Sequence, residues 1–335
     1  MRSFVNIDDY SIATNHLAYV KDIIMEKDDQ PVWSKIGFRI VLNVVTHPLD
    51  YAKTLIQIGY EPIDPRQTTS IFGKPVLGLP NIFQYVSYIK SVDGLTGCYR
   101  GLAPRLCANA IYAIAYDKAV SSVEFEDEPD DSVPIDELED HKRDKKYVQD
   151  FFRTLIGRTV AIVCSHPLEV VTVRMMAQFV GGETKYDSII GSFGEIYKEN
   201  GISGFFAGLV PKLVASFTTL VIVNTSTYVL NKYFIHDREL RGFMNATVTF
   251  LASTFTYPFL VVSQCMAVNK CGLTAGELPM MPVYADWTDC WKHLSRSNQL
   301  KRGSSLFFRY YTGPQVIING RPVVDKSNRF FKKID

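Results

Sequence analysis

The chain of 335 residues lacks the signatures of a catalytic, nucleotide-binding or metal-binding site. It has no G-x-S-x-G nucleophile motif, no G-x-G-x-x-G motif and no G-x-x-x-x-G-K-S/T phosphate loop. Its six cysteines form no C-x-x-C pair, and Cys107, Cys164 and Cys265 stand in apolar stretches, so we expect buried, reduced thiols. We therefore predict a protein that is not an enzyme and that holds no metal and no cofactor.

The sequence also lacks an excess of charge of either sign. Its 36 Lys and Arg residues face 35 Asp and Glu residues, which argues against a nucleic-acid partner. The first thirty residues include Asp8, Asp9 and Glu26 and contain no apolar core followed by small residues. We therefore expect neither a secretory signal nor an Arg-rich transit peptide there.

Two stretches lack charge altogether and are long enough to cross a membrane. Residues 213–231 and 242–269 carry no Asp, Glu, Lys or Arg, and about 20 apolar residues span a hydrocarbon core. Three more apolar stretches contain a few charges, so a hydropathy scan is expected to miss them, but they occupy matching positions in the repeat described next. We predict five membrane-spanning helices, at residues 33–58, 103–122, 151–180, 209–234 and 243–270.

A proline inside an apolar helical stretch occurs three times. The surrounding residues are similar: His47-Pro48-Leu49-Asp50, His166-Pro167-Leu168-Glu169 and Tyr257-Pro258-Phe259-Leu260. A proline in a helix removes a backbone hydrogen bond and kinks the helix. We therefore expect kinks at Pro48, Pro167 and Pro258, and we interpret the pattern as an internal repeat.

The repeat has a second half that is punctuated by glycine. Four positions agree at fixed offsets between the first two copies: Gly94 with Gly201, Gly101 with Gly208, Pro104 with Pro211, and Arg105 with Lys212. The third copy keeps only a remnant at residues 302–309. The sequence therefore predicts two complete repeats and one degenerate repeat.

Polar residues form a stripe along the predicted kinked helices. They recur every three or four residues, which places them on one helical face. A charge inside a membrane costs several kcal/mol unless it faces protein or water, so the stripe favours a hydrophilic groove. In the alternative interpretation, Asp50 and Lys53 merely neutralise each other. The predicted groove residues are Arg39, Asn43, His47, Asp50, Lys53, Gln57, Arg158, Glu169 and Arg174.

These motifs resemble those of the mitochondrial carrier family, whose repeat carries Pro-x-Asp/Glu-x-x-Lys/Arg on a kinked helix. Residues 48–53 match this motif fully, residues 167–172 keep the acid but end in Thr172, and residues 258–263 have lost both charges. In transporting carriers these charges pair between the three kinked helices and close a gate. The resemblance therefore implies the carrier fold, but the remaining charges are too few for the usual gate.

The end of the sequence departs further from the family pattern. Residues 310–335 are charged and contain Pro314 and Pro322, where a carrier has a sixth apolar helix. We predict an all-α membrane protein, a pseudo-threefold carrier-like bundle of about five transmembrane helices without the sixth. Its expected parts are an N-terminal segment (1–32), repeat 1 (33–122), an acidic-to-basic linker (123–150), repeat 2 (151–235), degenerate repeat 3 (236–312) and a polar tail (313–335).

The resemblance is strongest to an outer-membrane branch of the family, and it implies a function. It implies residence in the mitochondrial outer membrane and insertion of α-helical proteins, tail-anchored ones included, into that membrane. The implied partners are membrane lipids, client transmembrane helices and a pro-apoptotic BH3 protein, and lipid scrambling could use the same groove. A solute transporter of the carrier type and a non-transporting receptor or scaffold remain as alternatives.

Overall fold

A computed structural model of the chain describes residues 32–70, 73–123, 140–233, 238–313, 315–318 and 321–324. Most of the expected N-terminal segment, most of the linker and the end of the polar tail lie outside these residues. Five long helices dominate the fold, and each contains most of a predicted span, although α5 begins well before residue 151: α2 (Val32–Ile58), α4 (Leu102–Ser121), α5 (Asp140–Ala177), α7 (Leu209–Tyr233) and α8 (Arg238–Val268). The three prolines lie inside α2, α5 and α8.

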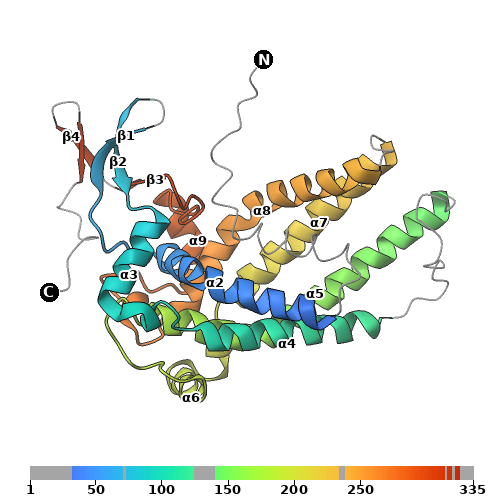
Figure 1. Cartoon of the computed structure of the whole chain (residues 1–335), viewed down its shortest axis with the longest axis horizontal. Helices are drawn as coiled ribbons and strands as arrows, with labels where there is room; N and C mark the ends of the chain where they lie inside the picture. Colours follow the sequence, from blue (N-terminus) through green and yellow to red (C-terminus); the bar gives the residue numbers. More distant parts are fainter. Residues whose placement is uncertain are drawn as a thin grey trace.

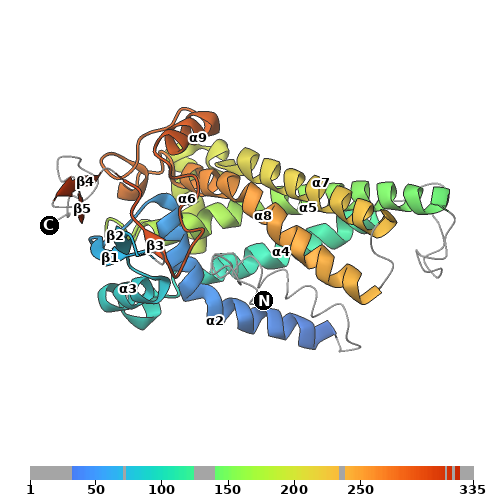
Figure 2. The ribbon, with the colours of Figure 1, turned by 90° about the horizontal axis from the view of Figure 1, so that it is seen from above.

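The long helices are arranged in pairs that converge at one end of the molecule. Helix α4 lies along α5, and α7 lies along α8 (Figure 1). The carboxyl-terminal halves of the kinked helices α2, α5 and α8 meet in a buried core that includes Tyr51, Leu55, Val171 and Val262. We call this the closed end, and Figure 2 shows α3, α9 and the strands gathered around it.

Each repeat places a short helix at the closed end, and a side chain caps each one. These helices are α3 (Ile82–Gly97), α6 (Ile189–Asn200) and α9 (Trp287–Arg296). Their N-cap side chains, Asn81, Ser188 and Asp286, accept hydrogen bonds from backbone N–H groups of the first turn. Two 3-10 turns, η3 (Ile202–Phe206) and η4 (Thr274–Gly276), complete the connections. The third repeat has therefore kept its short helix.

Length and hydropathy identify three possible membrane spans within the described residues, at Asp144–Ala177, Ile202–Tyr233 and Leu240–Val268. The expectation that hydropathy would miss the stretch at 151–180 was therefore wrong. The apolar segments around Arg158 and Glu169 outweigh these two charges. Helices α2 and α4 are not among the three, as expected from their charges.

One contact recurs in all three repeats and explains why the closed end holds together. The side chain before each proline bonds the carbonyl oxygen that precedes a glycine of positive φ. The three contacts are His47 Nε2 with Arg100 O (3.0 Å), His166 Nε2 with Ala207 O (3.0 Å), and the Tyr257 hydroxyl, which donates to Arg302 O (2.7 Å). In its described residues the degenerate repeat forms no last helix, but it keeps this contact with the core.

The glycine after each of these carbonyls lets the chain pass close to a neighbouring helix. Gly208 has a φ of +80°, and a Cβ atom there would overlap the carbonyl oxygen of Ser263 in α8. Gly101 is the equivalent residue and approaches Thr172 in α5. Gly101 and Gly208 are therefore packing sites, where a side chain would force helices apart.

The residues after α9 form strands where the carrier pattern has a helix. Strand β3 (Arg309–Tyr310) pairs with β2 (Pro75–Leu79), which pairs with β1 (Arg66–Thr69), all antiparallel. Strands β4 (Gln315–Ile318) and β5 (Arg321–Val324) form a hairpin. The carrier-like helical fold class is confirmed, and the strands are an addition that the sequence analysis did not predict.

The cysteines only partly follow the expectation of burial. Cys98, Cys265, Cys271 and Cys290 are buried, whereas Cys107 and Cys164 are exposed. The two exposed thiols lie in the long helices α4 and α5, and an apolar stretch that faces lipid looks the same in sequence as one that faces the core.

Candidate functional site

The first and last kinked helices are joined near the closed end. The Lys53 ammonium lies 5.8 Å from the centre of the Tyr257 ring. The Gln57 amide donates to the Tyr257 hydroxyl at 3.0 Å, and the Cys265 thiol lies 3.5 Å from the Gln57 carbonyl oxygen. Lys53 and Gln57 are each only 6% exposed, so this junction is well packed.

Beyond that junction the two helices part, and burial decreases along the face of α8 that carries Tyr257. Residues seven or four apart share a face of α8. On one such face Val261 and Tyr257 are 0% and 6% exposed, whereas Phe243 is 69% exposed. Figure 1 shows α2 and α8 diverging away from the closed end. We call this region the α2–α8 opening.

The predicted groove residues of α2 follow the same gradient. Gln57 and Lys53 are buried at the junction, and Asp50 and Asn43 are half-buried farther along the stripe. Arg39 belongs to α2, but the structure does not describe its side chain. The stripe of α2 therefore leads from the junction toward the α2–α8 opening.

The two acidic stripe residues are paired within their own repeats. Asp50 in α2 forms an ion pair with Arg105 in α4, with 2.9 Å between Oδ2 and Nη2. Glu169 in α5 forms an ion pair with Lys212 in α7 and also accepts a bond from the Ser165 hydroxyl at 3.3 Å. Arg105 and Lys212 occupy equivalent positions in their repeats, so the two ion pairs are equivalent contacts. Both pairs are partly exposed, with side-chain exposures between 16% and 33%.

The third repeat has lost this ion pair on both sides. The positions equivalent to the acid and the base are occupied by Leu260 and Phe307. Two ion pairs of this kind thus remain, one between α2 and α4 and one between α5 and α7. Sequence analysis missed the basic partners, although the alignment of Arg105 with Lys212 was visible.

His47 has a structural place in the fold. Its ring is fully buried, stacks with Tyr99 at 6.1 Å between centroids, and uses Nε2 for the contact with Arg100. Its role matches that of His166 in the second repeat. We therefore assign His47 to packing of the closed end.

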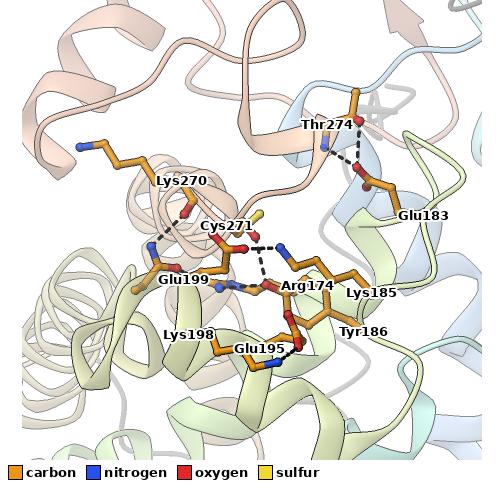
Figure 3. A network of polar contacts seen from close by, with 11 residues as sticks. Arg174, Glu183, Lys185, Tyr186, Glu195, Lys198, Glu199, Lys270, Cys271 and Thr274 are labelled. Carbon is orange, nitrogen blue, oxygen red and sulfur yellow. Dashed lines mark hydrogen bonds and ion pairs between the residues drawn. The ribbon is translucent and has the colours of Figure 1, made fainter.

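Arg174 also lies away from the opening, in a fully buried position at the end of α5 (Figure 3). Its guanidinium donates to the Ala267 carbonyl oxygen at 3.0 Å, to the Tyr186 hydroxyl at 3.3 Å and to Asn200 Oδ1 at 2.9 Å. A side chain so enclosed does not contact cargo in this conformation. We assign it to joining α5, α6 and α8, which departs from its predicted place in the groove.

The remaining stripe residues are divided between an open and a packed environment. Arg158 is half-buried on α5. The uncharged stripe of α8 binds α7: Thr256 lies 2.9 Å from Thr219, Asn245 accepts from Thr227 at 3.1 Å, and the Ser263 hydroxyl donates to the Gly208 carbonyl oxygen at 2.8 Å. Of the predicted groove residues with described side chains, Asn43, Asp50, Arg158 and Glu169 are partly exposed.

Comparison with known proteins agrees with this architecture. The family profile described as "Mitochondrial carrier protein" matches residues 39–123 and 143–238, which are the first two repeats. Mitochondrial carrier homolog 2 of Mus musculus is 38% identical over 80% of this chain and 90% of its own length. The Homo sapiens protein of the same name is 39% identical over the same shares. Mitochondrial carrier homolog 1 of Mus musculus is 38% identical over 80% of this chain and 74% of its own length.

The profile covers more than half of the chain, and the relatives match most of it. The helices long enough to cross a bilayer agree with the mitochondrial membrane proteins of this family. The chain is therefore a membrane protein of the mitochondrial carrier family, and within that family it belongs with the mitochondrial carrier homologs.

Proposed function

We propose that this protein is an insertase that passes α-helical proteins, including tail-anchored ones, into the mitochondrial outer membrane. The observation that carries the proposal is the α2–α8 opening. Because the chain after Gly303 forms strands in its described part, no sixth helix covers the facing surfaces of α2 and α8 there. A bundle of this shape offers a partly polar interior that is open sideways to lipid.

The physical problem of insertion fits this arrangement. An incoming helix carries a polar end that must cross headgroups and hydrocarbon, where an unsatisfied polar group costs several kcal/mol. The partly exposed pairs Asp50–Arg105 and Glu169–Lys212 would offer that end charge and hydrogen-bond partners. The apolar part of the client would move sideways through the opening into lipid. Such a process needs no covalent chemistry.

We extend the proposal to partners through the family resemblance. Client transmembrane helices and lipids would both contact the opening, and a lipid headgroup is a polar load that could cross along the same stripe. Recruitment of a pro-apoptotic BH3 protein, and hence a link to apoptosis, belongs to the same proposal. Membership of the carrier family supports the mitochondrial membrane as the place where these partners would be met.

A solute transporter of the carrier type is less well supported by the geometry. In the carrier pattern, acidic and basic residues of the three kinked helices pair with one another and open and close a gate. Here Asp50 pairs with Arg105 of α4 and Glu169 pairs with Lys212 of α7, each within its own repeat, and the third repeat has neither charge. These pairs join the two long helices of one repeat. They do not join the kinked helices to one another, as the gate of a transporting carrier requires.

Reconstitution tests the proposal directly. We expect the purified full-length chain in liposomes to accelerate entry of a tail-anchored helix, measured by protease protection, relative to empty liposomes. A soluble client without its apolar segment serves as the control and should remain outside. Exchange of a small solute without faster helix insertion would support the transporter instead, and BH3-protein binding without either activity would support the scaffold.

A further inference from the structure

The closed end contains a cavity that the insertase proposal does not use. Its volume is about 1360 Å³, larger than many small-molecule sites. Its walls come from all three repeats: residues 59–62 after α2, Val180 and Gly181 after α5, residues 280–282 after α8, and much of the segment 293–313. The cavity therefore exists only because the three repeats converge here.

Positive charge predominates on the walls of this closed-end cavity. Four cationic side chains, Arg296, Lys301, Arg302 and Arg309, face two carboxylates, Glu61 and Asp64. Arg309 is already used, because it forms an ion pair with Glu61 and donates to the Pro80 carbonyl oxygen at 2.9 Å. Burial raises the pKa of Glu61 above its ordinary value, and the charge of Arg309 opposes that shift. With the Glu61–Arg309 pair set aside, the cavity wall keeps three cations against the single carboxylate of Asp64. These cations are Arg296, Lys301 and Arg302.

Arg302 is held in place without a carboxylate partner. Its Nη2 donates to the Cys265 thiol at 3.1 Å, and a thiol is a weak acceptor. Its Nε is buried and has no hydrogen-bond partner, and within the described residues Arg302 forms no ion pair. The carboxylate near Arg302, that of Glu61, is ion-paired with Arg309, so a bound anion would give the Arg302 guanidinium an ion pair of its own.

The backbone makes room for this guanidinium. Gly59 has a φ of +98°, and a Cβ atom there would overlap Arg302 Nη1. The glycine after α2 thus lets an arginine from the third repeat reach the carboxyl-terminal end of α2. Burial and the nearby charge of Arg302 lower the pKa of His293, which also lines the cavity and contacts the Tyr284 hydroxyl at 2.9 Å.

We propose that the closed-end cavity binds a small phosphate-bearing anion through Arg302, with Lys301 and Arg296 completing the charge. Three cations favour a multiply charged group over a single carboxylate, and the planar guanidinium matches phosphate oxygens. The remaining volume is lined in part by Tyr60, Tyr88 and Phe308, which suit the carbon body of an organic phosphate. The site lies at the opposite end of α2 from the opening, so the proposal does not depend on insertase activity.

Titration calorimetry of the full-length protein in detergent, at constant ionic strength, tests the site with inorganic pyrophosphate. We expect saturable binding that Arg302→Gln weakens at least about tenfold, because a charge-assisted contact is lost. The matched control is Arg100→Gln, which changes the same charge at the equivalent position of repeat 1. Arg100 pairs with Asp93 at 3.2 Å and does not line this cavity, so its loss should leave binding unchanged.

Further arms separate the possible sources of phosphate and guard against misfolding. If pyrophosphate gives no heat but phosphatidylglycerol in mixed micelles raises the melting temperature only while Arg302 is present, the ligand is a lipid headgroup. If Arg302→Gln does not fold, the exposed variants Lys301→Gln and Arg296→Gln decide, each expected to weaken binding several-fold. Lys301→Gln should leave helix insertion unchanged. Equal binding by all variants, or none by the native protein to either probe, would overturn the proposal.

Discussion

Replacement of Arg174 by methionine is expected to lower the free energy of unfolding by about 3–5 kcal/mol. Methionine fills much of the volume but offers no donor. Three acceptors that the guanidinium now satisfies would lose that partner: the Tyr186 hydroxyl (Figure 3), the Ala267 carbonyl oxygen and Asn200 Oδ1. These acceptors lie on three different segments, so their loss would loosen α5 from α6 and α8 together.

The measurement is thermal unfolding of the purified protein in detergent. A loss of this size corresponds to a fall in melting temperature of roughly 5–10 °C. The melting temperature of the Arg174→Lys variant should fall less, because an ammonium keeps the charge and can still reach one or two acceptors. The control is Lys198→Met, which removes an exposed ion pair with Glu195 and should change little. An Arg174→Met protein as stable as the native one would contradict the structural assignment.

Reversal of charge at Glu169 is expected to slow helix insertion by about tenfold, which corresponds to about 1.4 kcal/mol. The Glu169→Lys variant places two ammonium groups together in the bundle, where Glu169 and Lys212 now attract each other. Two like charges about 4 Å apart repel by about 1 kcal/mol in water and by about 4 kcal/mol near a protein surface. Partial exposure of this pair brings the repulsion toward the lower value. The double variant Glu169→Lys with Lys212→Glu should recover most of the rate.

A second reversal separates a local effect from a general one. Glu195→Lys creates the same repulsion beside Lys198 on the surface of α6, outside the bundle. Its insertion rate should equal that of the native protein. If the Glu169→Lys rate falls only as far as the amount of folded protein falls, the pair is structural and the polar stripe has no part in insertion.

The prolines and glycines made the helices predictable. Pro48, Pro167 and Pro258 marked three kinked helices. The aligned glycines Gly101 and Gly208 marked the residues directly before the second long helix of repeats 1 and 2. These residues act through backbone geometry, which is local and therefore visible in sequence. The threefold contact of His47, His166 and Tyr257 with backbone carbonyls could not be predicted, because its acceptors carry no side-chain signature.

The site was harder to predict than the fold because helical spacing assigns a face but not a neighbour. Spacing in the sequence offers Lys53, three residues away, as the partner of Asp50. The ion pair of Asp50 is instead with Arg105 in another helix. Arg174 shared the region of the stripe, but its partners lie in α8, in α6 and in the loop after α5, and they enclose it. The conformation of that loop depends on tertiary contacts. The stripe in the sequence therefore assigns residues to helical faces, and the structure leaves Asn43, Asp50, Arg158 and Glu169 of that set partly exposed.

Site-specific photocrosslinking during insertion tests the α2–α8 opening most directly. A photoreactive residue at Phe243 of α8, or at Asn43 of α2, would lie on the surfaces that face each other. The matched control is Val45, which is 65% exposed against 69% for Phe243 but lies on the face of α2 opposite the stripe. We predict client adducts at positions 43 and 243 in several-fold excess over position 45. Equal yields at the three positions, or the highest yield at position 45, would contradict a lateral path between α2 and α8.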